Sequence, residues 1–246
     1  MEYVIHLAAL SSVPASVDDP EAAHHINASG TLNLLTASKE AGVRRLVYAS
    51  TSAVYGNNPM QPKDETMAPE LESPYAASKL AGEYYCRVFS GVYGLETVSL
   101  RYFNIYGKRQ DPQSQYAAVI PKFIISVLKG ESPTIHGDGN QSRDFISVDD
   151  CNQANIKACF APDCSGMFFN IGSGKSISVN DLFVKIRRLI GNDIEAIYGE
   201  PRTGDVKESL ADISRARKFL SYSPDVEMDS GLADTIGWYR KTLGET

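Results

Sequence analysis

Tyr75 and Lys79 stand four positions apart in the stretch SPYAASK, directly after Ser73 and Pro74. Serine followed by proline favours a helix start, because serine can cap the helix and the N–H that proline lacks would have no partner there. Side chains four residues apart are neighbours on a helix, so the phenol and the ammonium would lie side by side. A neighbouring positive charge favours the ionised form of a phenol, whose usual pKa is about 10, and a phenolate can act as a general base. The same spacing also fits a helix with a half-buried tyrosine and a solvated lysine.

Hydroxyl groups cluster in the segment STSAVYG, residues 50–56, which begins with three hydroxyl side chains in a row. A second segment with reactive and hydrogen-bonding side chains, RYFNIYG, covers residues 101–107. Both follow apolar runs that predict buried strands, and ligands of parallel α/β sheets bind beyond the carboxyl ends of the strands. We therefore expect these hydroxyls and the Tyr75–Lys79 pair to converge on one substrate. Serine and threonine are also common in ordinary turns, so this segment alone assigns no site.

Strands and helices alternate along the first part of the chain. Apolar runs predict strands at 4–10, 45–50 and 96–103, and longer segments predict helices at 20–41 and 74–93. This order favours βαβ units and a doubly wound parallel sheet, which is an α/β fold.

Shorter strands alternate with helices in the second part of the chain. We expect a sheet domain over residues 1–107 and a smaller α/β substrate domain over residues 108–246, with the chain crossing back to the sheet near 141–172. The predicted strands of this part are 133–136, 144–148, 167–171 and 194–198, and its predicted helices are 118–130, 149–160, 179–190, 213–220 and 229–242.

The bulk properties exclude several classes of partner. The chain has a net charge of −6 and a pI of about 5.3, which argues against nucleic acid or an anionic membrane as the main partner. No apolar run reaches the about 20 residues of a membrane span, and the N-terminus lacks the basic region of a signal peptide. The four cysteines and four histidines show no metal-ligand spacing, so we expect reduced, mostly buried thiols in a cytoplasmic protein without a metal site.

The order of several motifs resembles the extended short-chain dehydrogenase/reductase family, and within it the UDP-sugar 4-epimerases. The resemblance covers essentially the whole chain. Its motifs are HLAAL (6–10), NASGTLNLL (27–35), YASTSAVYG (48–56), SPYAASKLAGE (73–83), LRYFNIYG (100–107), KRQDP (108–112), YAAVIPKFI (116–124), GDGNQSRDF (137–145) and RTGD (202–205).

The resemblance implies a Rossmann-type sheet, NAD as cofactor and a catalytic set of three residues. Tyr75 matches the base, Lys79 its partner, which also contacts the nicotinamide ribose, and Thr51 the hydroxyl that bonds the sugar 4-OH. The residues implied to contact the cofactor are Leu7, Ala8, Ala9, Asn27, Tyr75, Lys79, Tyr102 and Phe103. The residues implied to contact the UDP-sugar, in addition to Thr51, are Asn104, Ala118, Val119, Ile135, His136, Arg143, Arg202, Asp205 and Ser209.

The implied reaction is 4-epimerisation of a UDP-hexose through a transient 4-keto sugar, in a homodimer. Guanidinium groups such as those of Arg143 and Arg202 suit a diphosphate because they pair with its oxygens bidentately, although either could form a surface ion pair. Ser209 stands at the family's gate position, where a small residue leaves room for an N-acetyl group. We therefore expect UDP-GlcNAc and UDP-GalNAc as substrates, together with UDP-Glc and UDP-Gal. A 4,6-dehydratase is disfavoured, because such enzymes have two carboxylates directly after the threonine and here Ser52 and Ala53 follow it.

One part of the family pattern is absent from the sequence. The family begins with a strand, a G-x-x-G-x-x-G turn and a helix that binds the dinucleotide pyrophosphate, and no such motif occurs here. The sequence matches the family from its fourth strand onward, about 60–70 residues into the usual layout. We therefore expect a fragment, a truncated gene model or a partner chain that supplies the rest, with VIHLAAL as an exposed sheet edge. The alternative function is a catalytically inactive module that binds nucleotide sugars.

Overall fold

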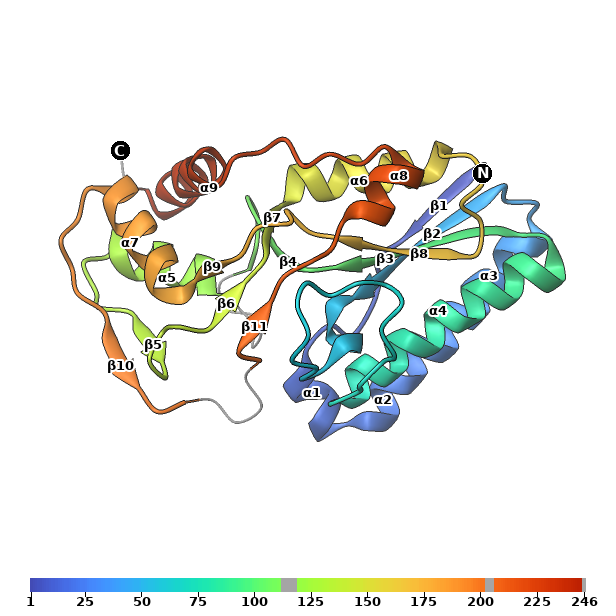
Figure 1. Ribbon diagram of the computed structural model, residues 1–246, viewed down its shortest axis with the longest axis horizontal. Coiled ribbons are helices and arrows are strands. Elements are labelled where there is room, and N and C mark those ends of the chain that lie inside the picture. Colours follow the sequence, from blue (N-terminus) through green and yellow to red (C-terminus); the bar gives the residue numbers. More distant parts are fainter. Residues whose placement is uncertain (112–118, 202–205, 245–246) are drawn as a thin grey trace.

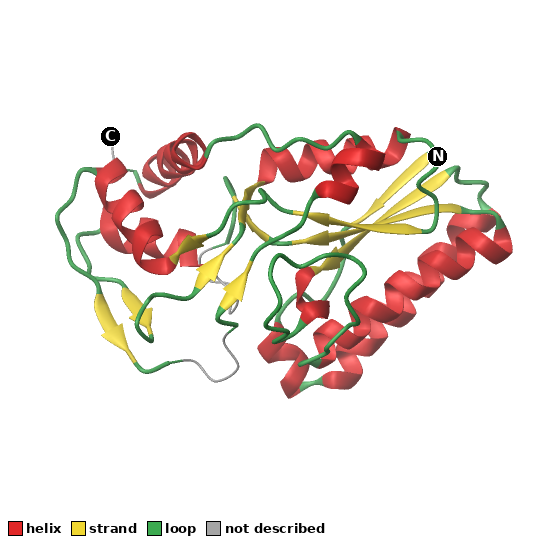
Figure 2. Cartoon of the chain, viewed as in Figure 1, coloured by secondary structure: helices red, strands yellow, loops and turns green. Residues whose placement is uncertain are grey.

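The computed structural model describes residues 1–111, 119–201 and 206–244. Four strands form the main sheet (Figures 1 and 2), in the order β1-β2-β3-β8. These strands are β1 (Tyr3–His6), β2 (Arg45–Thr51), β3 (Glu96–Tyr102) and β8 (Met167–Ile171). All three pairings are parallel, and every residue of β2 is buried, as expected for a strand covered on both faces. The predicted α/β class with a parallel sheet is confirmed.

Helices cover both faces of this sheet. The helices α3 (Gly30–Glu40) and α4 (Pro74–Tyr93) lie on one face, and α6 (Val148–Phe160) and α8 (Ser214–Leu220) lie on the other (Figure 1). Strand β8 and the helices α6 and α8 come from the part of the chain after residue 107, so this part also contributes to the main sheet and to its cover.

The predicted helix 20–41 is confirmed as one continuous helical stretch over residues 20–40, which contains a π-helical turn and follows a short helix that was not predicted. The chain forms α1 (Val13–Asp18), α2 (Pro20–His24), one π-helical turn η1 (His25–Ser29) and then α3. Asp19 caps α2 and Pro20 opens it, and these residues separate α2 from α1.

The predicted strand 4–10 is shorter in the structure and ends at His6. Leu10 donates its backbone N–H to the side-chain oxygen of Asn27 and accepts from the amide nitrogen of the same side chain, at 2.8 and 3.0 Å. Because these backbone groups are bonded to Asn27, Leu10 does not extend the ladder with β2.

A second group of elements surrounds its own hydrophobic core, at the left in Figure 1. The helices α5 (Val119–Leu128), α7 (Val179–Ile190) and α9 (Met228–Leu243) pack together around Phe123 and Phe183. The short strands of this region are β4 (Asn104–Tyr106), β5 (Thr134–His136), β6 (Ser142–Arg143), β7 (Phe145–Ser147), β9 (Ile177–Ser178), β10 (Ile197–Gly199) and β11 (Glu208–Ser209).

Asp144 joins the two groups of elements. It is fully buried, and its carboxylate accepts hydrogen bonds from the backbone N–H groups of Ser173, Gly174 and Ala211 at 2.7, 3.0 and 3.2 Å. Ser173 and Gly174 follow β8, and Ala211 follows β11. One carboxylate thus fixes the end of the central sheet against the strand that precedes α8.

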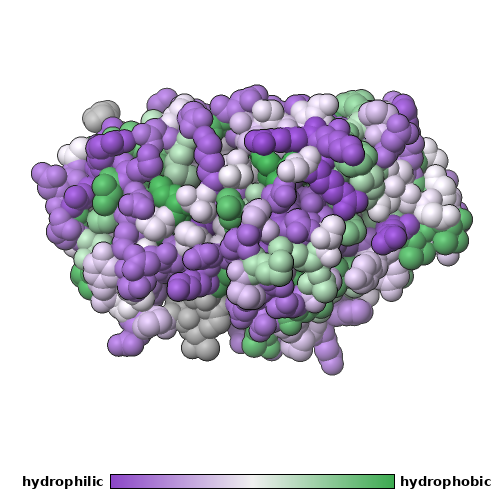
Figure 3. Space-filling view, in the orientation of Figure 1, coloured by the Kyte–Doolittle hydropathy of each residue, from purple (hydrophilic) through white to green (hydrophobic). Residues whose placement is uncertain are grey.

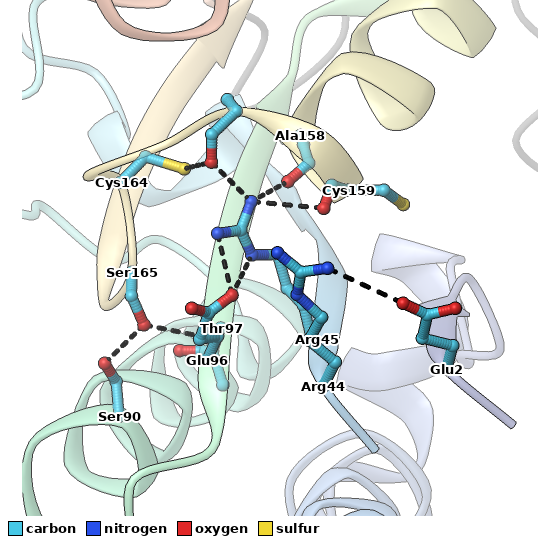
Figure 4. Close-up of polar contacts among 11 residues, drawn as sticks. Glu2, Arg44, Arg45, Ser90, Glu96, Thr97, Ala158, Cys159, Cys164 and Ser165 are labelled. Atoms are coloured by element: carbon cyan, nitrogen blue, oxygen red, sulfur yellow. Dashed lines mark hydrogen bonds and ion pairs between the residues drawn. The ribbon is translucent and has the colours of Figure 1, made fainter.

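Arg45 fixes the opposite, amino end of the sheet. Its guanidinium points at the end of α6 and donates to the carbonyl oxygens of Ala158, Cys159 and Ala161 at 2.9, 3.2 and 2.6 Å (Figure 4). It also pairs with Glu96 at 2.8 Å, directly across the β2–β3 ladder. A cation at the carboxyl end of a helix stabilises it, because the last carbonyls have no partner within the helix.

The surface drawn in Figure 3 is mostly hydrophilic, with hydrophobic residues in small groups. Within the described ranges, no helix combines the length and the apolar character that crossing a bilayer requires. The four cysteines are buried and form no disulfide, as predicted.

Candidate active site

The start of α4 positions the predicted base. The hydroxyl of Ser73 accepts from the backbone N–H of Ala76 at 3.1 Å, and Pro74 occupies the first turn, so the predicted cap is confirmed. The backbone N–H of Tyr75 donates to the hydroxyl of Ser16 at 3.0 Å, which ties this turn to α1. Tyr75 is half-buried, and the helix continues to Lys79 one turn later.

Lys79 is buried, so its interpretation as a solvated lysine is wrong. Only 3% of it is exposed, and its ammonium lies 4.4 Å from the ring centroid of Tyr48 on β2. Burial lowers the pKa of Lys79 to about 8, because the charged form loses its hydration. Among the residues that the structure describes, none accepts a hydrogen bond from this ammonium. Its three N–H groups are thus available to a ligand.

Thr51 lies at the carboxyl end of β2, as predicted. Its hydroxyl accepts from the backbone N–H of Ala53 at 3.1 Å and caps the short helix η2 (Ser52–Tyr55). The hydroxyl proton is a donor that this bond does not use. Thr51 pairs with Tyr102 across the β2–β3 ladder.

Tyr102 bonds a residue on the α6 face of the sheet. Its hydroxyl donates to the side-chain oxygen of Asn155 on α6 at 2.8 Å. Phe103, the next residue, is buried in the central core. That these two aromatic residues border the nicotinamide stays a prediction.

The predicted cofactor residues at the end of β1 differ in exposure. Leu7 and Ala8 are exposed and Ala9 is half-buried, whereas Asn27 is buried. Besides its bonds to Leu10, the amide nitrogen of Asn27 donates to the hydroxyl of Ser78 on α4 at 2.9 Å. Asn27 therefore joins the end of β1 to the helix of Tyr75 and Lys79.

Arg143 and Ser209, predicted to contact the substrate, lie side by side. They are direct partners in the parallel β6–β11 ladder, and both are half-buried. Asn104 donates from its backbone and from its side chain to the carbonyl of Asp144, both at 3.1 Å, which places it beside Arg143 in the chain.

The other predicted substrate residues are more scattered. Val119 is the first residue of α5, and Ile135 on β5 is buried in the second core. His136 is half-buried, with its Nδ1 3.2 Å from the carbonyl of Glu200. Ala118, Arg202 and Asp205 lie outside the described residues.

Gln61 holds the chain on both sides of Ser209 and was not predicted from the sequence. Its amide nitrogen donates to the carbonyl of Glu208 at 2.6 Å, and its amide oxygen accepts from the backbone N–H of Leu210 at 3.1 Å. The loop that follows Thr51 is thus fastened to the strand of the predicted gate. A lone glutamine in a polar loop gives no sequence signal for such a contact.

A buried ion pair between Glu83 and Arg101 was also missed. Glu83 lies on α4 and Arg101 on β3, and their side chains meet at 2.8 Å with 1% and 3% exposure. The sequence held one signal for this pair, because an arginine within an apolar run that predicts a buried strand requires a partner.

Comparison with known proteins gives consistent matches over nearly the whole chain. Residues 1–172 match the model of the NAD dependent epimerase/dehydratase family. A putative UDP-glucose 4-epimerase of Methanocaldococcus jannaschii is 41% identical over 241 residues, which covers 98% of this chain and 77% of that protein.

Solved structures agree with this match. A UDP-N-acetylglucosamine 4-epimerase from Methanobrevibacter ruminantium, in complex with UDP-N-acetylmuramic acid, superposes with a TM-score of 0.95 at 44% identity, over 98% of this chain and 77% of that one. A Thermus thermophilus UDP-glucose 4-epimerase in complex with NAD superposes with a TM-score of 0.88 at 36% identity, over 97% and 77%.

Proposed function

Because the chain belongs to the NAD dependent epimerase/dehydratase family, we propose that it catalyses the NAD-dependent 4-epimerisation of a UDP-hexose. The observation that supports this most strongly is the buried ammonium of Lys79, one turn after Tyr75 on α4. It has no acceptor among the described residues, and the hydroxyls of a nicotinamide ribose are acceptors of the required kind. The residues at this end of the sheet therefore fit the nicotinamide half of NAD.

Two residues of the chain would act on the sugar, and a third would act on the cofactor and on the base. Tyr75 takes the proton of the 4-hydroxyl and later returns it to the same oxygen. Thr51 donates its free hydroxyl proton to that oxygen and orients it. Lys79 holds the ribose and favours the phenolate of Tyr75 through its charge. Bound NAD supplies the acceptor and donor of the C4 hydride, so that the sugar passes through a 4-keto form.

The nucleotide would be held at the junction of β6 and β11. Arg143 offers a guanidinium to the diphosphate, and Arg202 would offer a second one. An anchored diphosphate lets the keto sugar turn while the nucleotide stays bound, which the inversion at C4 requires.

We propose the N-acetylated pair UDP-GlcNAc and UDP-GalNAc as substrates, alongside UDP-Glc and UDP-Gal. Ser209 supports this, because it is a small residue at the gate position and lies next to Arg143 in the β6–β11 ladder. The segment Thr51-Ser52-Ala53 has no carboxylate, which keeps a 4,6-dehydratase the less favoured reaction.

We further propose that the protein is a cytoplasmic homodimer. Tyr84, Val88 and Val92 are exposed apolar residues at intervals of four on α4. This spacing forms one apolar stripe along the helix, which can pack against the same stripe of a second copy. Sedimentation of the Val88→Glu variant as a monomer would support this contact, and an unchanged mass would contradict it.

The direct test is a turnover assay. The purified protein is denatured to detect released NAD, and the native protein is incubated with NAD and UDP-GlcNAc while UDP-GalNAc is followed by proton NMR. Formation of the epimer is the expected result. Binding of UDP without NAD and without turnover would instead indicate the non-catalytic module that binds nucleotide sugars.

A further inference from the structure

Glu83 is the centre of a buried hydrogen-bond cluster between α4 and the sheet. Its carboxylate accepts from Nε and Nη2 of Arg101 at 2.9 and 2.8 Å, and from the hydroxyl of Ser50. Ser50 and Arg101 are direct partners in the β2–β3 ladder. A single side chain of the helix thus fastens it to both central strands at once.

The three contact points lie next to the residues of the candidate site. Ser50 immediately precedes Thr51, and Glu83 follows Lys79 by four residues and Tyr75 by eight. Positions at this spacing share one face of a helix, and the distance from Tyr75 to Glu83 along the axis is about 12 Å. A shift or rotation of α4 on the sheet would therefore move Tyr75 and Lys79 relative to Thr51.

The cluster continues into the loop that follows Thr51. Nη1 of Arg101 donates to the hydroxyl of Tyr55 at 2.9 Å, and this hydroxyl donates to the side-chain oxygen of Asn170 on β8 at 2.6 Å. The backbone N–H of Asn170 donates to the carboxylate of Glu65 at 2.7 Å. Helix α4, strands β2, β3 and β8, and the loop with Glu65 are thus connected through this cluster.

A buried ion pair is a poor way to stabilise a fold. Removing two charges from water costs as much as their attraction returns, and apolar residues of similar volume often stabilise equally well or better. The geometry of the pair, two parallel bonds between a planar guanidinium and a carboxylate, instead fixes relative position. Because Glu83 lies on the same helix as Tyr75 and Lys79, the ion pair fixes the position of these two residues relative to the sheet.

We propose that Glu83, acting through Arg101 and Ser50, is a positioning residue that sets helix α4 on the sheet and so holds Tyr75 and Lys79 at the right distance from Thr51. This inference rests on the proposed function. It predicts that loss of the pair lowers kcat while substrate binding at Arg143 and Ser209, on other strands, is retained.

The test compares two variants with a matched control in the whole protein. Glu83→Leu combined with Arg101→Met replaces both charges by apolar side chains and leaves no unpaired charge, so it retains much of the stability. We expect its kcat for UDP-GlcNAc to fall about 100-fold, the scale of loss for a misplacement of about 1 Å, with KM changed less than about threefold. Glu83→Asp keeps the charge and the fold but shortens the side chain, and its kcat should fall about tenfold with an unchanged KM.

The control is Arg45→Met, which removes a buried arginine from the opposite end of β2. It should lower the melting temperature and leave kcat of the folded protein unchanged. If Glu83→Asp and the double variant both keep the wild-type kcat, or if KM rises in step with the loss of kcat, the positioning role is wrong. If the wild-type protein shows no epimerisation with NAD and UDP-sugar, the proposed function itself fails.

Discussion

The two central strands, β2 and β3, have one buried arginine at their amino end and another at their carboxyl end. The two arginines form hydrogen bonds to different kinds of partner. At the amino end, Arg45 bonds three backbone carbonyls at the end of α6 and the carboxylate of Glu96, whose side chain is 41% exposed (Figure 4). At the carboxyl end, Arg101 bonds the buried carboxylate of Glu83 and the hydroxyl of Tyr55. Backbone carbonyls stay in place whichever side chains surround them, whereas the partners of Arg101 belong to elements that bear the candidate site residues.

This difference separates two uses of the same chemistry. The amino-end pair connects one helix end to the sheet, and its loss should lower the free energy of unfolding. The carboxyl-end pair connects a helix, three strands and a loop whose relative positions define a site. Its loss should lower kcat even in a variant whose stability is restored.

The largest effect should follow from Tyr75→Phe at the carboxyl end. Removing the phenol hydroxyl removes the proposed base, and we expect kcat to fall about 10²- to 10⁴-fold while the melting temperature stays within about 2 °C. Steady-state kinetics with UDP-GlcNAc and a thermal melt measure the two effects.

Tyr84→Phe is the matched control for this variant, because Tyr84 is exposed on the same helix. It should retain the wild-type kcat. A Tyr75→Phe variant as active as this control would remove Tyr75 from the role of base.

Arg101→Met alone should produce the largest loss of stability. It leaves the carboxylate of Glu83 buried without its cation, and breaking a buried pair in this way costs about 3–5 kcal/mol. The free energy of unfolding in urea measures this cost. Adding Glu83→Leu to the same variant should return most of it, and a double variant no more stable than Arg101→Met would contradict the account of an uncompensated charge.

The central strands were predictable from the sequence, and the pairs at their ends were not. Residues 45–50 and 96–103 form largely apolar runs, and a parallel strand covered on both faces has this pattern. The partners of Arg101 lie 18 and 46 residues away in the chain, so they depend on how α4 and η2 pack on the sheet. Local spacing cannot supply such contacts.

The parts of the candidate site that depend on neighbouring residues in the sequence were predictable, and the parts that depend on packing between elements were not. The cap at Ser73 and the position of Tyr75 and Lys79 follow from a few adjacent residues. The burial of Lys79 does not, because the ring of Tyr48 that covers it comes from another element, β2. The helix 20–41 was also predictable, because Asp19 and Pro20 form a local helix start and Gly42 follows its last turn. The π-helical turn within it has no such local signal.

The carboxyl end should also respond to acid, through His6 at the end of β1. Thr31 uses its hydroxyl proton to bond the carbonyl of Asn27, so it accepts from Nε2 of a neutral His6 at 3.0 Å. Burial, and then the charge of Lys79, lower the pKa of His6 to about 4, from about 6.5 for an exposed imidazole.

Because the folded state binds this proton less readily than the unfolded state, the contribution of His6 is full above about pH 6.5 and is lost as pH falls toward about 4. The loss amounts to at most about 3 kcal/mol. Urea unfolding from about pH 7 to about pH 4 should show a steeper loss for the wild type than for His6→Gln. His24→Gln, at an exposed histidine of α2, should follow the wild type, and equal slopes for wild type and His6→Gln would contradict the assignment.

Arg45→Met should lower stability by about 2 kcal/mol, less than Arg101→Met. Glu96 is partly exposed and can be hydrated once its partner is lost, so the cost is mainly that of the three carbonyls at the end of α6. Urea unfolding of the two arginine variants side by side measures the difference. A larger loss for Arg45→Met would reverse the comparison between the two ends.

The smallest expected effect is a change of specificity without a change of stability, at Ser209. This residue is half-buried and lies beside Arg143 in the β6–β11 ladder, where Gln61 holds the backbone on both sides of it. A tyrosine side chain there would occupy the space proposed for the acetamido group, so Ser209→Tyr should lower kcat/KM for UDP-GlcNAc about tenfold relative to UDP-Glc. Ser209→Ala is the matched control, because it removes the hydroxyl without adding volume and should keep the wild-type ratio. Competition assays with both sugars measure the ratio directly, and an equal loss on the two substrates would show that the gate lies elsewhere in the carboxyl-end site.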